Sequence, residues 1–127
     1  MNEESPLQRI ARLDEIPEGG MVFAYRDGPV EESGILLLAH GVPVAWRNLC
    51  RHLAVRLDCE RRGEFTAPGS RNLVCQQHGA RYDPVSGACL AGPCLGSRLR
   101  PLPIRVENGV VFLEVTALGG LFAVAGT

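Results

Sequence analysis

Hydrophobic positions along the chain form short runs separated by polar residues, glycines and prolines. The runs are five to eight residues long, and apolar positions recur at helical spacing over no stretch beyond about ten residues. The expected strands cover Leu7–Leu13, Met21–Arg26, Gly34–Ala39, Val42–Asn48, Asn72–Gln76, Leu99–Val106 and Val110–Thr116. Short, regularly spaced strands of this kind predict an all-β sandwich or barrel.

Turn signals separate several of these strands. Asp27-Gly28-Pro29, His40-Gly41 and Glu107-Asn108-Gly109 each stand between two expected strands. A single helical turn is predicted at Asp14–Ile16, because Pro17 stops it. The polar segment Cys59–Arg71 is predicted to be a surface loop.

Length and charge limit the classes of function. The chain has 127 residues, enough for one domain, and its net charge of -1 argues against nucleic-acid binding. No apolar run reaches the roughly 18 residues of a membrane span, and the first six residues are acidic and polar. We therefore expect a cytoplasmic protein that does not bind membranes. Residues 33–127 hold ten arginines and six acids, a bias that marks either a solvated arginine-rich surface, the more frequent case, or a place where an acidic partner docks.

Four potential metal ligands lie in two short segments. Cys50 and His52 stand two residues apart, and Cys75 and His78 stand three apart. Each segment offers one thiolate and one imidazole beside strand-like sequence, so two adjacent loops would make a site of two cysteines and two histidines. The third histidine, His40, precedes Gly41 and is interpreted as an ordinary surface or packing residue.

The mixed order of ligands favours a binuclear iron site over a single zinc ion, because zinc fingers usually group two cysteines in one knuckle and two histidines in the other. If both cysteines bind one iron and both histidines the other, the loops clamp a [2Fe-2S] cluster between them. Two ferric ions, two sulfides and two thiolates are neutral together, whereas four thiolates leave two negative charges. Histidine ligation therefore raises the potential, to about -150 to +300 mV against roughly -400 mV for four-cysteine ferredoxins. A zinc-binding structural module stays the alternative.

The residues around these ligands resemble the Rieske family. Its mark, C-x-H and C-x-x-H-G followed by an aromatic residue, Asp and a Gly-containing turn, is matched by Cys50-Arg51-His52 and by Cys75-Gln76-Gln77-His78-Gly79, with Tyr82-Asp83 and Ser86-Gly87 downstream. Gly92-Pro93 resembles the family's proline loop, which covers the cluster. The resemblance covers about residues 7–116 and implies one [2Fe-2S] cluster per chain.

The resemblance also implies an architecture for a single domain of residues 1–127. It is an antiparallel β-sandwich or barrel with a small cluster-binding subdomain formed by two loops. Residues 7–44 and 96–116 would form the base sheets, residues 45–95 the subdomain, and residues 117–127 an apolar tail. The residues expected to surround the cluster and its ligands are Leu53, Gly79, Ala80, Tyr82, Gly92 and Pro93.

Several positions depart from the respiratory and photosynthetic members of that family. The ligand segments are separated by 22 residues, from 53 to 74, and the surplus falls in the Cys59–Arg71 loop. The family's extra disulfide is absent, since Val55 and Gln77 occupy its positions. Ala80 stands where a serine donates a hydrogen bond to the cluster, while Tyr82 keeps the second donor. We therefore expect a potential in the lower part of the Rieske range.

The other cysteines leave alternatives open. Cys59 is interpreted as incidental, whereas Cys89 and Cys94 flank Leu90-Ala91-Gly92-Pro93 and could approach each other. They are either a redox-active pair or small apolar packing residues.

The resemblance implies a one-electron carrier rather than an enzyme. Such a protein accepts electrons from an NAD(P)H-dependent, flavin-containing reductase and passes them to a terminal oxygenase; we expect a monomer. Arg51, Arg56 and Arg81 would orient an acidic partner. The alternative function is a small Rieske subunit or cluster-bearing regulatory module of a larger oxidoreductase.

Overall fold

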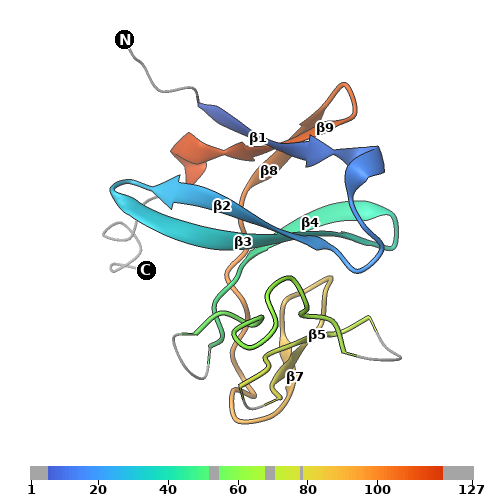
Figure 1. The fold of residues 1–127 in the computed structure, drawn as a ribbon, viewed down its shortest axis with the longest axis vertical. Coiled ribbons are helices and arrows are strands. Elements are labelled where there is room, and N and C mark those ends of the chain that lie inside the picture. The colour runs from blue at the N-terminus through green and yellow to red at the C-terminus, as the bar shows by residue number, and fades with distance from the viewer. Residues whose placement is uncertain (1–5, 52–54, 68–70, 78, 119–127) are drawn as a thin grey trace.

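The described residues form three antiparallel sheets of three strands each. The computed structural model describes residues 6–51, 55–67, 71–77 and 79–118. The first sheet has the order β1 (Leu7–Arg12), β9 (Val110–Glu114), β8 (Ile104–Glu107). The second has the order β2 (Met21–Asp27), β3 (Val30–Ala39), β4 (Val42–Arg47). The third has the order β5 (Leu73–Val74), β6 (Arg81–Tyr82), β7 (Cys89–Ala91). Figure 1 shows the first two sheets one above the other and the third below them.

Two short 3-10 helices accompany the strands. The first, η1 (Leu13–Glu15), follows β1 and confirms the predicted helical turn, although it begins and ends one residue earlier. The second, η2 (Val115–Ala117), follows β9. Within the part of the chain that the structure describes, no helix is long and apolar enough to span a bilayer.

Two of the predicted turns are tight hairpins whose backbone needs left-handed residues. His40 and Gly41 join β3 to β4 with φ angles of 54° and 81°, and Asn108 and Gly109 join β8 to β9 with 52° and 76°. Two consecutive positive φ angles are the mark of a type I′ turn, whose twist matches that of the flanking strands. His40 thus has a local backbone role, in agreement with its interpretation as an ordinary residue.

Strand β3 is buried on both faces. Leu36 packs with Phe23, Ala45, Val111 and Leu113 in the core between the first two sheets. Its neighbours Ile35 and Leu37 point to the other face and pack into a second core, which includes Cys50, Cys75 and Tyr82. Because side chains alternate along a strand, one continuous apolar run can serve two cores. The run Gly34–Ala39 therefore connects the base of the molecule to the region of the expected ligands.

Two strand predictions need correction, and two observed strands were not predicted. The run Leu99–Val106 enters a ladder as β8 only at Ile104, because Pro101 and Pro103 carry no N–H to donate. The run Asn72–Gln76 contributes only Leu73–Val74 to a strand. Strands β6 and β7, of two and three residues, were missed because they are too short to show a period.

The third sheet lies in one continuous insertion between β4 and β8. The chain leaves β4 and returns beside it, since the Arg47 amide donates to the Arg100 carbonyl at 2.9 Å and the Leu102 amide donates to the Ala45 carbonyl at 3.0 Å. Trp46 also ties β4 to the insertion, because its indole N–H donates to the Pro84 carbonyl at 3.0 Å. A Cβ at residue 87 would lie 2.7 Å from the Trp46 ring, so this turn requires Gly87.

Candidate metal centre

The first predicted ligand loop begins directly after β4. The Cys50 amide donates to the Val55 carbonyl at 2.7 Å, which closes the loop across the residues between them. The Cys50 side chain is buried in the second core. Upstream, the Asn48 amide donates to the Ser33 carbonyl at 2.8 Å and holds the start of the loop against β3.

The second predicted ligand loop connects β5 to β6 and closes on itself. The Cys75 amide donates to the Ala80 carbonyl at 2.9 Å, and the Gly79 amide donates back to the Cys75 carbonyl at 2.8 Å. Gly79 has a φ of +75°, a conformation that glycine adopts without strain. Cys75 and Ala80 are both buried at this point, in the same core as Cys50.

The two loops are brought side by side by backbone and side-chain contacts. The Gln76 amide donates to the Leu57 carbonyl at 2.9 Å, which ties the second loop to the segment that follows the first. The Tyr82 hydroxyl accepts a hydrogen bond from the Arg51 amide at 3.0 Å and lies 3.4 Å from the Cys50 sulfur. Burial raises the pKa of Tyr82, and its contacts with Cys50 and Cys94 raise it further, so the phenol keeps its proton. A protonated phenol beside a thiolate is a hydrogen-bond donor to sulfur.

The histidine ligands lie outside the described residues. His52, His78 and the neighbouring Leu53 fall in that category, so the four-ligand set stays a prediction of the sequence. Among the residues that are described, no group of three or more His, Cys, Asp or Glu could hold a metal ion. The structure does bring the two predicted sulfur ligands, Cys50 and Cys75, into one buried core from loops 25 residues apart.

The predicted proline loop packs on the second ligand loop. Gly92 has a φ of +103°, and a Cβ at this position would lie 3.0 Å from Ala80 Cα. Two of the residues expected around the cluster are therefore in close backbone contact, and only glycine allows that approach. Pro93 follows and is exposed.

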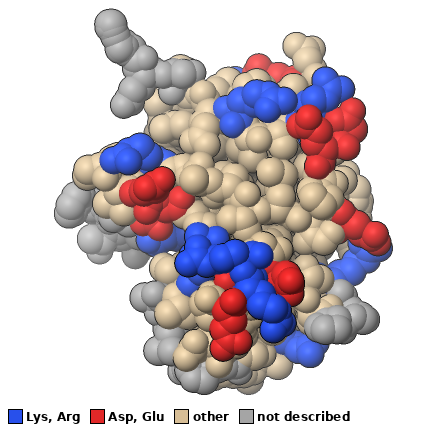
Figure 2. Space-filling model, viewed as in Figure 1, with Lys and Arg blue, Asp and Glu red and all other residues tan. Residues whose placement is uncertain are grey.

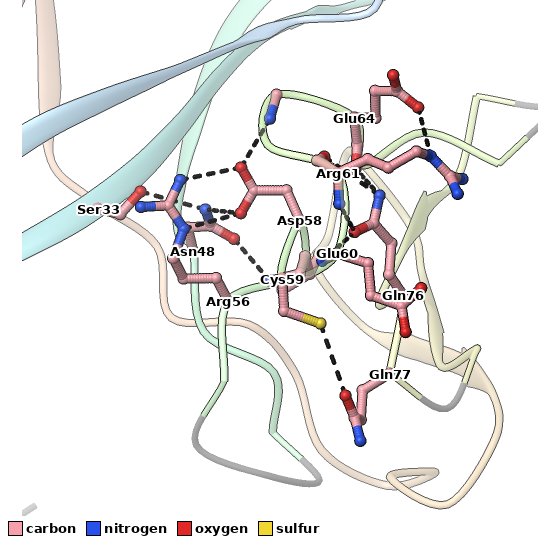
Figure 3. Close-up of polar contacts among 12 residues, drawn as sticks. Ser33, Asn48, Arg56, Asp58, Cys59, Glu60, Arg61, Glu64, Gln76 and Gln77 are labelled. Atoms are coloured by element: carbon pink, nitrogen blue, oxygen red, sulfur yellow. Dashed lines mark hydrogen bonds and ion pairs between the residues drawn. The ribbon is translucent and has the colours of Figure 1, made fainter.

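A buried carboxylate, Asp58, forms hydrogen bonds with residues on both sides of the first ligand loop, and the sequence did not predict this role. Asp58 is fully buried and accepts hydrogen bonds from Arg56 Nε, Asn48 Nδ2 and the Gly63 amide at 2.9, 2.9 and 2.8 Å (Figure 3). Burial on its own would raise the pKa of Asp58, but the hydrogen bonds from Arg56, Gly63 and Asn48 outweigh burial and lower the pKa. Asn48 also accepts from the Leu57 amide at 2.9 Å.

Arg56 has a structural role beside the predicted one, which stays a prediction. It forms an ion pair with Asp58 at 2.9 Å and helps to neutralise a buried charge, so it is part of the scaffold. Arg51 is exposed and Arg81 is half-buried, and their orientation of an acidic partner stays a prediction. Figure 2 shows basic and acidic side chains interspersed over one face of the molecule.

The second residue of the C-x-x-H segment holds the long loop. Gln76 Oε1 accepts from the Glu60 and Arg61 amides at 2.6 and 2.7 Å, and its Nε2 donates to the Glu64 carbonyl at 2.6 Å (Figure 3). Arg61 and Glu64 form an exposed ion pair within the same loop. The segment Cys59–Arg71 was expected to be a surface loop. Its first part is fastened to the second ligand loop by one amide side chain, but Phe65 and Ala67 are buried, so the prediction is wrong for that part of the segment.

The remaining cysteines are thiols in the structure. Cys89 and Cys94 are buried and in contact, and burial followed by that contact raises the pKa of Cys89 to about 11. Since the thiolate is the reactive form, the packing interpretation is favoured over a redox-active pair. Cys59 is half-buried, and its thiol lies 3.8 Å from Gln77 Oε1 as a weak donor.

Two adjacent loops thus bury one cysteine each, and the Gly92-Pro93 turn packs on the second of them. A family model described as the Rieske [2Fe-2S] domain matches residues 7–111. The chain therefore belongs to the Rieske [2Fe-2S] family, and the predicted all-β fold class is confirmed. Its cofactor is one [2Fe-2S] cluster, and it is an electron-transfer ferredoxin.

Solved structures share the fold over most of the chain. The ferredoxin of carbazole 1,9a-dioxygenase from Nocardioides aromaticivorans IC177 is 25% identical with a TM-score of 0.65, and the match covers 87% of this chain and 98% of that chain. The Sphingomonas yanoikuyae B1 ferredoxin is 21% identical with a TM-score of 0.62, and the match covers 84% and 95%. A chain from the complex of reduced oxygenase and oxidized ferredoxin in carbazole 1,9a-dioxygenase is 14% identical with a TM-score of 0.66, covering 88% and 95%. No curated protein matches the sequence.

Proposed function

We propose that Cys50, His52, Cys75 and His78 hold the [2Fe-2S] cluster, with both thiolates on one iron and both imidazoles on the other. The observation that carries this assignment is the pair of closed loops that bury Cys50 and Cys75 in one core, with a protonated Tyr82 beside the first sulfur. The donor set fits the cluster, because two thiolates and two imidazoles leave its oxidised form neutral.

The chain's own residues shape the conditions for electron transfer. When bound, the cluster supplies a one-electron couple. The core around Cys50 and Cys75 keeps water from the sulfurs, and the Tyr82 proton favours the more negative, reduced state. Ala80 offers no hydroxyl of its own, and its backbone carbonyl is occupied by the Cys75 amide. One hydroxyl donor in place of two supports a potential in the lower part of the Rieske range.

The electrons pass, on this proposal, from an NAD(P)H-dependent flavin reductase to a terminal oxygenase in the cytoplasm. The likeness to a chain described as the ferredoxin of a carbazole dioxygenase supports an oxygenase as the acceptor. We assign residues 7–44 and 96–116 to the base and residues 45–95 to the cluster-binding part, and we expect a monomer. Co-purification with a large catalytic subunit would replace this carrier by the alternative, a small Rieske subunit.

The ligand assignment is tested by electron paramagnetic resonance of anaerobically purified protein before and after reduction. We expect a signal only after reduction, with an average g below the free-electron value and below that of four-cysteine clusters. His52→Ala and His78→Ala should each abolish it. His40→Ala is the matched control, because His40 lies in an exposed hairpin turn and should leave the signal unchanged. A silent reduced sample that also fails reconstitution with iron and sulfide would point to a zinc module.

A further inference from the structure

The hydroxyl of the buried Tyr82 is a meeting point of three polar groups from different segments. It lies 3.0 Å from the Arg51 amide, 3.4 Å from the Cys50 sulfur and 3.2 Å from the Cys94 sulfur. The first two belong to the first ligand loop, and Cys94 follows the Gly92-Pro93 turn. Tyr82 and Cys94 are both buried, so water does not compete for these contacts.

The number of protons on each group limits the direction of each hydrogen bond at the Tyr82 hydroxyl. A phenol has one proton to donate and two lone pairs with which to accept. The Arg51 amide can only donate, and it takes one lone pair. A thiolate ligand has no proton, so Cys50 can only accept, and a charged acceptor forms the stronger hydrogen bond. Cys94 is the one neighbour among these three that could either donate to the hydroxyl or take its proton away from Cys50.

The geometry places Cys94 as a donor. Its thiol donates to the Tyr82 oxygen, which fills the second lone pair and leaves the phenol proton for Cys50. The backbone at Cys94 is fixed, because its carbonyl accepts from the Ser97 amide at 3.0 Å and from the Ser97 hydroxyl at 2.7 Å. The neighbouring Cys89 thiol donates to the Ala91 carbonyl at 3.4 Å and not to Tyr82.

We infer that Cys94 is a positioning residue that directs the Tyr82 proton to the Cys50 sulfur and thereby raises the reduction potential. The inference rests on the proposed role of Cys50 as a ligand. Cys94 acts in two ways. Its hydrogen bond occupies the second lone pair of the Tyr82 oxygen, which fixes the direction of the phenol O–H. The same hydrogen bond polarises that O–H bond. Hydrogen bonds in a chain strengthen one another by about 10–30% per bond.

The test is the midpoint potential of the loaded protein, measured by film voltammetry for Cys94→Ala, Tyr82→Phe and the double variant. Tyr82→Phe removes the donor and gives the larger negative shift. Cys94→Ala lowers the equilibrium constant for reduction by about twofold, which is about 18 mV at 59 mV per tenfold for one electron. In the Tyr82→Phe background the Cys94→Ala change has no effect, because there is no phenol left to direct.

Three further variants separate orientation from packing. Cys94→Ser keeps a donor and should retain the potential, whereas Cys94→Val fills the site without a donor and should shift it as Cys94→Ala does. Cys89→Ala makes the same truncation in the adjacent buried thiol, which contacts Cys94 and bonds the Ala91 carbonyl, and should shift the potential less than Cys94→Ala does. If Cys94→Ala does not load the cluster, the comparison of Cys94→Val with Cys94→Ser decides the question.

Two results would overturn the inference about Cys94. One is an unchanged potential in both Cys94→Ala and Cys94→Val. The other is an equal shift in the presence and absence of the Tyr82 hydroxyl. Failure of the ligand assignment is distinguishable, since it would appear in the wild-type paramagnetic spectrum before any Cys94 variant is made.

Discussion

The two ligand loops are stabilised in different ways. The second loop closes on itself through two backbone hydrogen bonds between Cys75, Gly79 and Ala80. In the first, the described residues show a backbone bond from Cys50 to Val55, and further support comes from backbone and side-chain groups elsewhere in the sequence. Tyr82 binds the Arg51 amide from 31 residues away, and buried Asp58 anchors Asn48 and Arg56 on either side of the loop. The first loop is therefore the more sensitive to substitutions outside its own sequence.

The largest expected effect comes from Asp58→Ala. This substitution leaves Arg56, Asn48 and the Gly63 amide without their shared acceptor, and breaking a buried pair typically costs about 3 to 5 kcal/mol. We expect a loss of that order in the free energy of unfolding, measured with urea on the loaded protein. The control is Asp14→Ala, which removes an exposed carboxylate paired with Arg12 and should leave stability unchanged. Equal effects of the two variants would contradict the anchoring role.

A smaller loss of folding stability is expected when the pH is lowered. Folding lowers the pKa of Asp58 from its ordinary 3.8, so the unfolded state binds more protons there. The stability that this carboxylate contributes is complete above about pH 4 and is lost as the pH falls through the lower folded-state pKa. The difference in unfolding free energy between wild type and Asp58→Asn should therefore shrink on acidification. A difference that stays constant from about pH 6 to about pH 3 would show that Asp58 does not titrate in this way.

The smallest expected effect comes from Gln76→Ala, which addresses the second loop. The variant loses the side-chain bonds to Glu60, Arg61 and Glu64 but keeps the backbone closure of the loop. Lost hydrogen bonds of this kind cost about 1 kcal/mol each, less where water replaces them. We expect faster trypsin cleavage after Arg61, followed by mass spectrometry, with the cluster signal retained. Gln77→Ala is the control, since the one side-chain hydrogen bond of Gln77 to the described residues is a weak 3.8 Å contact with Cys59. Loss of the cluster in Gln76→Ala would show that the second loop also depends on outside support.

The parts that the sequence predicted are those with local signals. Hairpin turns such as His40-Gly41 follow from residues that adopt positive φ, and the alternation in the predicted strand Met21–Arg26 matches the burial pattern of β2. The cysteines of the candidate site were identified by spacing alone. By contrast, the burial of Asp58 and its hydrogen bonds with Asn48 and Gly63 depend on partners that only the fold brings together. The same holds for the Cys94 contact with Tyr82.

The return of the chain beside β4 has a consequence for how such a protein can evolve. Residues 48–99 leave and re-enter the base at one place, where Arg47 and Arg100 are hydrogen-bonded neighbours. A segment with adjacent ends can be exchanged for another without altering the order of the strands on either side, because the cost of closing it grows only slowly with its length. A change of length within this segment, such as the longer Cys59–Arg71 loop, is therefore compatible with the same order of strands outside it.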